Sequence, residues 1–107
     1  MDPKTYLNLA EACLQRVAQW LEDFDPDELD FSTTDGVVTL EFSDGKRFVL
    51  NRQAAADQMW YAAGARAWHY NWNAEASAWL DDRDGHALED NIGKTISEQL
   101  GRTIAMS

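Results

Sequence analysis

Residues 37–51, VVTLEFSDGKRFVLN, decide the fold class of this chain. In the first half, the apolar residues Val38, Leu40 and Phe42 alternate with other side chains, and the alternation resumes after Ser43-Asp44-Gly45. A period of two on both sides of a Gly-containing turn is typical of a β-hairpin. One face of this hairpin is apolar, which predicts an antiparallel sheet that is covered on a single side.

Similar short runs on either side extend this sheet. We expect six strands, at residues 29–34, 37–42, 46–51, 58–63, 67–72 and 78–81. Helical spacing predicts a first helix from an Asp2 cap to about Asp23 and a second from about Ala87 to Leu100, ended by Gly101. The expected fold is α+β: a two-layer α/β sandwich, with two helices packed on one face of an antiparallel sheet of about six strands. We expect residues 1–107 to form one domain.

The charge of the chain restricts its partners. Nineteen Asp and Glu against nine Lys and Arg give a net charge of −10. Nucleic acids and anionic lipids require positive potential, so we expect neither nucleic acid nor a membrane as partner. Cations and basic protein surfaces are the natural partners. The N-terminus has no signal-peptide pattern and no apolar run of 18 residues occurs, which predicts a cytoplasmic protein.

Much of the negative charge lies in residues 21–30, LEDFDPDELD. We call its carboxylates the acidic ridge: Glu22, Asp23, Asp25, Asp27, Glu28 and Asp30. Leu21, Phe24 and Leu29 lie among them as apolar anchors, and helical spacing places Glu11 on the same side as Glu22. Carboxylate oxygens bind hard cations, and a spread set predicts a shallow, weak site. A solvated face without a ligand remains the alternative.

Other chemistry is poorly supported. Cys13 lies on an apolar helical face and is expected to pack as a small hydrophobe. The two histidines and the cysteine lack metal-ligand spacing, and Asp82-Arg83-Asp84-Gly85 only partly resembles a calcium loop, so a polar turn is expected there. No G-x-S-x-G, H-E-x-x-H or Gly-rich phosphate loop is found, and we therefore expect a protein without enzymatic activity.

Trp60 has two possible placements. Alternation puts it on the opposite sheet face from Met59 and Tyr61, and periodicity does not say which face is buried. If Trp60 shares the outer face with polar Asn51, Gln53 and His69, it makes an aromatic patch of the kind that binds proteins. The alternative is a core tryptophan.

Several stretches together resemble a known family. They are Asn51-Arg52-Gln53, Gln58-Met59-Trp60, Trp68-His69-Tyr70, Trp79 and the 82–85 turn before the last helix, in addition to the acidic first helix. In this order they resemble bacterial frataxin, the CyaY family, over essentially the whole chain.

The resemblance implies an iron-binding adaptor or regulator of iron–sulfur cluster assembly, with weakly bound Fe²⁺ or Fe³⁺ as cofactor. It also implies a monomer that docks through the acidic ridge onto a cysteine desulfurase and its scaffold protein. The implied metal ligands are Glu11, Glu22, Asp23, Asp25, Asp27, Glu28 and Asp30. The implied partner-binding residues are Glu22, Asp23, Asp25, Asp27, Asn51, Gln53, Trp60 and His69.

The chain departs from the family at one point. Ala18 and Gln19 stand where the family often has a carboxylate pair, so the ridge is concentrated at residues 22–30. Two alternative functions stay open: an iron storage or chaperone protein with ferroxidase activity, and a metal-independent acidic protein-interaction module.

Overall fold

The computed structural model describes residues 1–106. In chain order, its elements are α1 (Pro3–Leu21), β1 (Leu29–Thr34), β2 (Val37–Phe42), β3 (Arg47–Gln53), the short 3₁₀ helix η1 (Ala54–Ala56), β4 (Gln58–Ala63), β5 (Arg66–Asn73), β6 (Ala78–Asp81) and α2 (Leu88–Leu100). The six strands form one sheet in the order β1-β2-β3-β4-β5-β6, and each neighbouring pair is antiparallel. No helix in residues 1–106 is long and apolar enough to cross a membrane.

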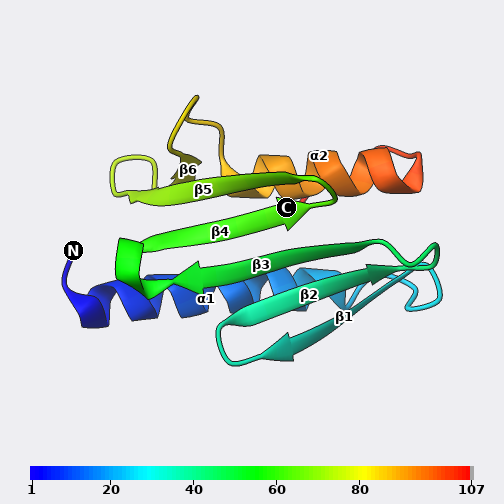
Figure 1. Cartoon of the computed structure of the whole chain (residues 1–107), viewed down its shortest axis with the longest axis horizontal. Coiled ribbons are helices and arrows are strands. Elements are labelled where there is room, and N and C mark those ends of the chain that lie inside the picture. The colour runs from blue at the N-terminus through cyan, green and yellow to red at the C-terminus, as the bar shows by residue number, and fades with distance from the viewer. Residues whose placement is uncertain (107) are drawn as a thin grey trace.

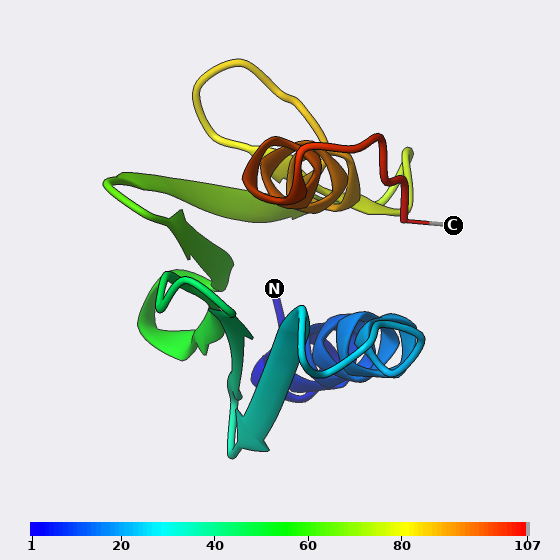
Figure 2. The same ribbon diagram turned by 90° about the vertical axis from the view of Figure 1, so that its right-hand side faces the viewer.

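Both helices cover the same face of this curved sheet (Figures 1 and 2). They run in the same direction, α1 over the β1–β3 half and α2 over the β5–β6 half. The predicted two-layer α+β sandwich is therefore confirmed. Its other sheet face carries no covering element among the described residues.

The N-terminal signals act as expected on α1. The Asp2 carboxylate accepts a hydrogen bond from the Thr5 backbone N–H at 3.0 Å, and Pro3 occupies the first turn, where a missing N–H costs nothing. One stripe of the helix is buried against the sheet: Tyr6, Ala10, Leu14, Val17 and Leu21. The regular helix ends at Leu21, two residues before the predicted end, and Glu22 is its C-cap.

The predicted hairpins are present, and β3 is longer than expected. Gly36 and Gly45 occupy the turns with φ of +77° and +90°, a backbone region that glycine enters without strain. β3 continues past Asn51 because Arg52 and Gln53 still pair with the start of β4. Predicted strand positions are otherwise correct to within one residue.

The second helix is held by its apolar stripe and by buried hydrogen bonds to the sheet. Leu88, Ile92 and Ile96 are buried, and the Tyr61 and Thr95 hydroxyls lie 2.7 Å apart. Gly101 ends the helix in the left-handed region, as predicted, with its N–H bonded to the Ser97 carbonyl. The chain then turns back over α2.

The core lies between the helices and the inner sheet face. Its strand residues all come from the inward positions of the alternation: Leu29, Val38, Leu40, Phe42, Phe48, Leu50, Met59, Tyr61, Ala63, Tyr70 and Trp79. The Tyr6 hydroxyl donates to the Gln58 carbonyl at 2.8 Å, which ties α1 to the start of β4. The ends of the sandwich and the outer sheet face lie outside this core.

Candidate functional site

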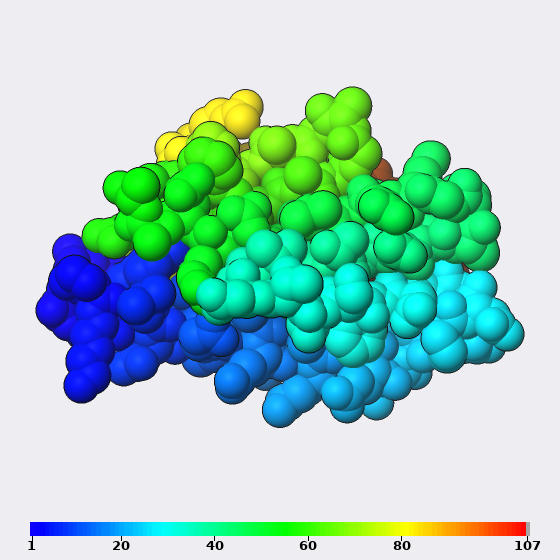
Figure 3. Space-filling model, turned by 60° about the horizontal axis from the view of Figure 1, so that its bottom comes forward, coloured from blue at the N-terminus to red at the C-terminus, as the bar shows by residue number. Residues whose placement is uncertain are grey.

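The acidic ridge is held at one end of the sandwich by buried apolar neighbours. Leu21 closes α1 and Leu29 opens β1, and each is only 1% exposed. Phe24 packs edge-on against Trp20, with ring centroids 5.0 Å apart. The carboxylates between these anchors are directed to solvent, and Figure 3 shows the segment in light blue and cyan at the right-hand end of the molecule. The ridge is thus a fixed part of the surface.

Most of the ridge charge is not neutralised within the chain. Glu28 forms a two-bond ion pair with Arg102, with N–O distances of 2.5 and 2.6 Å, and the arginine lowers the pKa of this carboxyl. Within residues 1–106, none of the other five ridge carboxylates forms an ion pair. Five negative charges in one exposed segment make a strong anionic surface.

The ridge carboxylates do not converge on one point. Among the described residues, a single group of three acidic, His or Cys side chains brings its donor atoms within 4.8 Å of one another, and no ridge residue belongs to it. Asp25 accepts from the Asp27 backbone N–H, and Asp30 from the Phe31 N–H, so part of their acceptor capacity is used by the local backbone. The geometry fits oxygen ligation that is shallow and weak.

Glu11 is separated from the rest of the predicted metal set. Its carboxylate accepts a 2.6 Å hydrogen bond from Arg52, which also binds Asp35 at 3.1 Å. A Cβ on Gly36 would lie 2.9 Å from the Arg52 guanidinium, so glycine makes room for this tie. Glu11 therefore helps to fasten α1 to the β1–β2 turn and to β3.

The outer sheet face carries the second predicted surface. Asn51, Trp60 and His69 form one row across β3, β4 and β5, since Trp60 pairs with both of the others in the strand register. The Trp60 and His69 rings stack with centroids 4.4 Å apart and planes 16° apart. We call Asn51, Gln53, Gln58, Trp60 and His69 the outer-face cluster.

The structure settles the two placements of Trp60 that the sequence left open. Trp60 is on the outer face and half-buried, while Met59 and Tyr61 are in the core. Its indole N–H donates to the Gln58 side-chain oxygen at 2.9 Å, and the Gln58 amide donates to Asn71 at 3.2 Å. An aromatic ring fixed by polar neighbours on an open face is typical of a protein-binding surface.

The two surfaces are offset from each other along the strands. α1 ends and β1 begins at the right of Figure 1, whereas β4 begins at the left, and Trp60 is its third residue. A partner that contacts both surfaces must extend along the strands.

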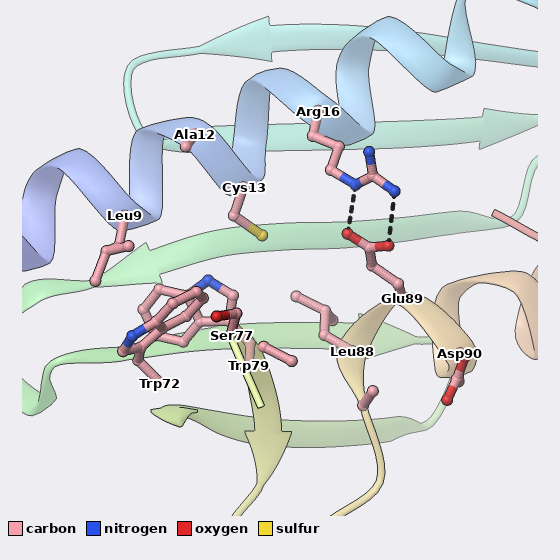
Figure 4. Close-up of a pocket in the computed structure, with 12 residues that line it drawn as sticks. Leu9, Ala12, Cys13, Arg16, Trp72, Ser77, Trp79, Leu88, Glu89 and Asp90 are labelled. Atoms are coloured by element: carbon pink, nitrogen blue, oxygen red, sulfur yellow. Dashed lines mark hydrogen bonds and ion pairs between the residues drawn. The ribbon is translucent and has the colours of Figure 1, made fainter. Parts of the chain in front are cut away.

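A pocket of about 440 Å³ lies elsewhere, between α1 and the segment that leads into α2 (Figure 4). Leu9, Cys13 and Trp72 are among its walls, and an Arg16–Glu89 ion pair at 2.6 Å borders it. Burial raises the pKa of the Cys13 thiol to about 12, so the group is protonated at neutral pH and packs against the core as predicted. None of the predicted site residues lines this pocket.

The sequence interpretation did not find the convergent group that residues 1–106 contain. It consists of Asp81, the last residue of β6, with Asp84 and His86 in the loop that follows. The spacing D-x-x-D-x-H was visible, but it matches neither the calcium-loop pattern nor the usual zinc spacings. Only the curvature of the loop brings the three side chains together.

Comparison with known proteins identifies the family. The family model described as a frataxin-like domain matches residues 1–102. The chain belongs to the frataxin-like family. It is 40% identical over 98 residues to a protein of Thioalkalivibrio sulfidiphilus named iron-sulfur cluster assembly protein CyaY, covering 91% of this chain and 92% of the relative. A protein of the same name from Dechloromonas aromatica is 35% identical, with 99% of both chains covered.

Solved frataxin structures have the same fold. Frataxin from Psychromonas ingrahamii superposes with a TM-score of 0.88 at 25% identity, covering 100% of this chain and 99% of that one. Yeast frataxin superposes at 0.75, with 23% identity and coverage of 94% and 85%. The frataxin fold of the chain is thereby shown, and the names of the relatives describe assembly proteins, not enzymes.

Proposed function

We propose that this chain acts in iron–sulfur cluster assembly as an iron-binding adaptor or regulator, and that the acidic ridge is its docking surface for a cysteine desulfurase. The relatives at 40% and 35% identity are named for that assembly process. The observation that carries the ridge assignment is the set of five exposed carboxylates without an ion-pair partner among residues 1–106. A basic partner surface would supply the missing counter-charges.

Iron is the cargo in this proposal, bound weakly by the ridge. Ridge oxygens suit hard cations, and their dispersed arrangement favours low affinity and tolerance of several ions. A yeast frataxin crystal structure described as a trimer complexed with ferrous iron has the same fold, with a TM-score of 0.61. Glu11 is the weakest of the proposed ligands, because Arg52 already binds its carboxylate.

The outer-face cluster is the proposed contact for the scaffold protein. Trp60 supplies aromatic area, while Asn51, Gln53 and His69 supply polar groups around it. Since this cluster and the ridge are offset along the sheet, we propose that one assembled complex contacts both. The expected monomeric state and cytoplasmic location remain predictions.

Charge reversal tests the docking surface. Asp23→Lys, Asp25→Lys and Asp27→Lys together should abolish binding to the purified desulfurase, measured by calorimetry at low salt. Wild-type binding should weaken steeply as salt is added. The matched control, Glu75→Lys with Asp90→Lys and Glu98→Lys, changes the net charge equally at exposed positions outside the ridge and should retain affinity.

Four results would count against the proposal. Unchanged affinity of the ridge variant would exclude the ridge as the docking surface. Equal losses of affinity in both triple variants would show that binding depends only on net charge. Turnover of Fe²⁺ oxidation above the buffer rate would favour the storage and ferroxidase alternative. Absence of both desulfurase binding and ridge perturbation by Fe²⁺ would favour a metal-independent interaction module.

The outer face is tested separately with Trp60→Ala. Calorimetry then measures binding of this variant to the purified scaffold protein.

A further inference from the structure

The loop that connects β6 to α2 forms a compact frame. The Asp81 N–H donates to the His86 carbonyl at 2.8 Å, and the Gly85 N–H donates to the Asp81 carbonyl at 3.1 Å. Leu80 and Ala87 form a bridge just outside these bonds. Residues 81–86 therefore sit on a backbone held at both ends, at the β6 edge of the sheet and at the opposite edge from the ridge (Figure 1).

Three donor atoms of two kinds meet on this frame. One carboxylate oxygen of Asp81, one of Asp84 and one ring nitrogen of His86 all lie within 4.8 Å of one another. Two oxygens and an imidazole nitrogen form a donor set for first-row transition metals, whereas Mg²⁺ and Ca²⁺ prefer oxygen alone. The ridge, in contrast, offers no nitrogen.

Asp81 supplies independent evidence that a cation would be stabilised here. Its side chain is buried, at 6% exposure, and one of its carboxylate oxygens belongs to this group. Oδ2 accepts from the Arg83 and Asp84 backbone N–H groups at 2.9 and 3.0 Å, while the buried Oδ1 has no hydrogen-bond partner. No basic side chain within residues 1–106 forms an ion pair with it. A buried carboxylate oxygen without a partner is unfavourable, and a bound cation would satisfy it.

His86 is already oriented for ligation. Its Nε2 lies 2.7 Å from the Tyr70 hydroxyl, which also accepts a 2.8 Å hydrogen bond from the Asn91 side-chain amide. In the structure, Nδ1–H donates to Asp84 Oδ1, and a metal that replaces this proton would leave Nε2–H to donate to Tyr70. Metal-binding histidines commonly have their second nitrogen fixed in this way. Nδ1 is 2.5 Å from Asp84 Oδ1, and Asp84 is 71% exposed, so its carboxylate has room to move and admit an ion.

We propose that Asp81, Asp84 and His86 form a second cation site, separate from the ridge, for a divalent first-row transition metal. Its ligands are one oxygen from each carboxylate and Nδ1 of His86. The site goes beyond the proposed function, because it needs neither the ridge nor the desulfurase. It should discriminate against Mg²⁺, since the nitrogen donor contributes more to transition-metal binding.

Paramagnetic Co²⁺ provides a direct test on the full chain. In amide NMR spectra with excess Mg²⁺ present, substoichiometric Co²⁺ should broaden the resonances of residues 81–87 before those of the ridge. His86→Gln should remove this early broadening. His69→Gln is the matched control, because it changes the other histidine, which lies 3.9 Å from Asp82 on the outer face. That variant should behave as wild type.

A second variant keeps the test independent of the His86–Tyr70 hydrogen bond. Asp84→Asn preserves an oxygen that can accept from the His86 backbone N–H but removes the ligand charge, and should weaken Co²⁺ binding at this loop at least about tenfold. The proposal is overturned if Co²⁺ broadens the ridge first in the presence of Mg²⁺. It is equally overturned if Asp84→Asn or His86→Gln, folded by circular dichroism, broadens like wild type.

Discussion

The acidic ridge and the 81–86 loop are both acid-rich connections, yet they differ in how their donors are arranged. The ridge has six carboxylates over nine residues, all on or near the surface and without a convergent group. The loop has fewer acids, but donors of three residues lie within 4.8 Å. High local charge thus makes an anionic surface, whereas a convergent donor group needs a backbone that turns its donors toward one point.

Burial explains much of this difference. Asp81 is buried and uses Oδ2 to bind two backbone N–H groups, so it is part of the loop's structure. Asp25 is exposed and accepts a single backbone bond. A buried carboxylate contributes to stability through the groups it satisfies, while an exposed one mainly contributes to the long-range field.

The largest expected effect is at Asp81. Asp81→Ala should lower the free energy of unfolding by about 1–3 kcal/mol, because two backbone N–H groups lose their acceptor. Asp25→Ala, on the ridge, should change it by no more than about 0.5 kcal/mol. Urea unfolding measures both. Equal losses for the two variants would show that the regions do not differ in structural role.

A smaller effect is expected where the ridge meets α1. Glu22 and Asp23 follow the helix C-terminus, where negative charge opposes the macrodipole. Glu22→Gln with Asp23→Asn should therefore raise stability by a few tenths of a kcal/mol per charge at low salt. The gain should fade in high salt, since exposed charges are screened. A gain that is independent of salt would point to a different cause.

The smallest expected effect concerns acid stability, through one carboxylate in each region. Arg102 lowers the pKa of Glu28, and hydrogen bonds from the His86 backbone and ring lower the pKa of Asp84. The ionised form of each carboxyl therefore stabilises the fold at pH values above its ordinary pKa. This stabilisation is lost as the pH falls through the lowered pKa of the folded state. Glu28→Gln and Asp84→Asn should each make stability fall less steeply in acid.

Unfolding followed against pH checks this expectation. Arg102→Gln serves as the control, because loss of the partner should flatten the acid dependence as Glu28→Gln does. An acid dependence that keeps its wild-type slope in both Glu28→Gln and Arg102→Gln would contradict the assigned cause.

Local signals were sufficient for most of the fold. The Asp2 cap, the turns at Gly36 and Gly45 and the Gly101 stop depend on a few neighbouring residues, and all were correctly predicted. The end of β3 was not, because its last two residues are strand through pairing with β4. The ridge could be located because its charges are consecutive, whereas the pairing of Glu11 with Arg52 joins residues 41 positions apart.

By itself, the sequence determined the elements, the single covered sheet face, the acidic ridge and the family resemblance, because each rests on short-range periodicity or on the identity of neighbouring residues. Only the tertiary structure decided that Trp60 stacks on His69 on the outer face and that Arg102 forms an ion pair with Glu28. It also decided that donor atoms of Asp81 and His86 lie close together. These contacts depend on strand register and loop curvature, which are set by packing of the whole core.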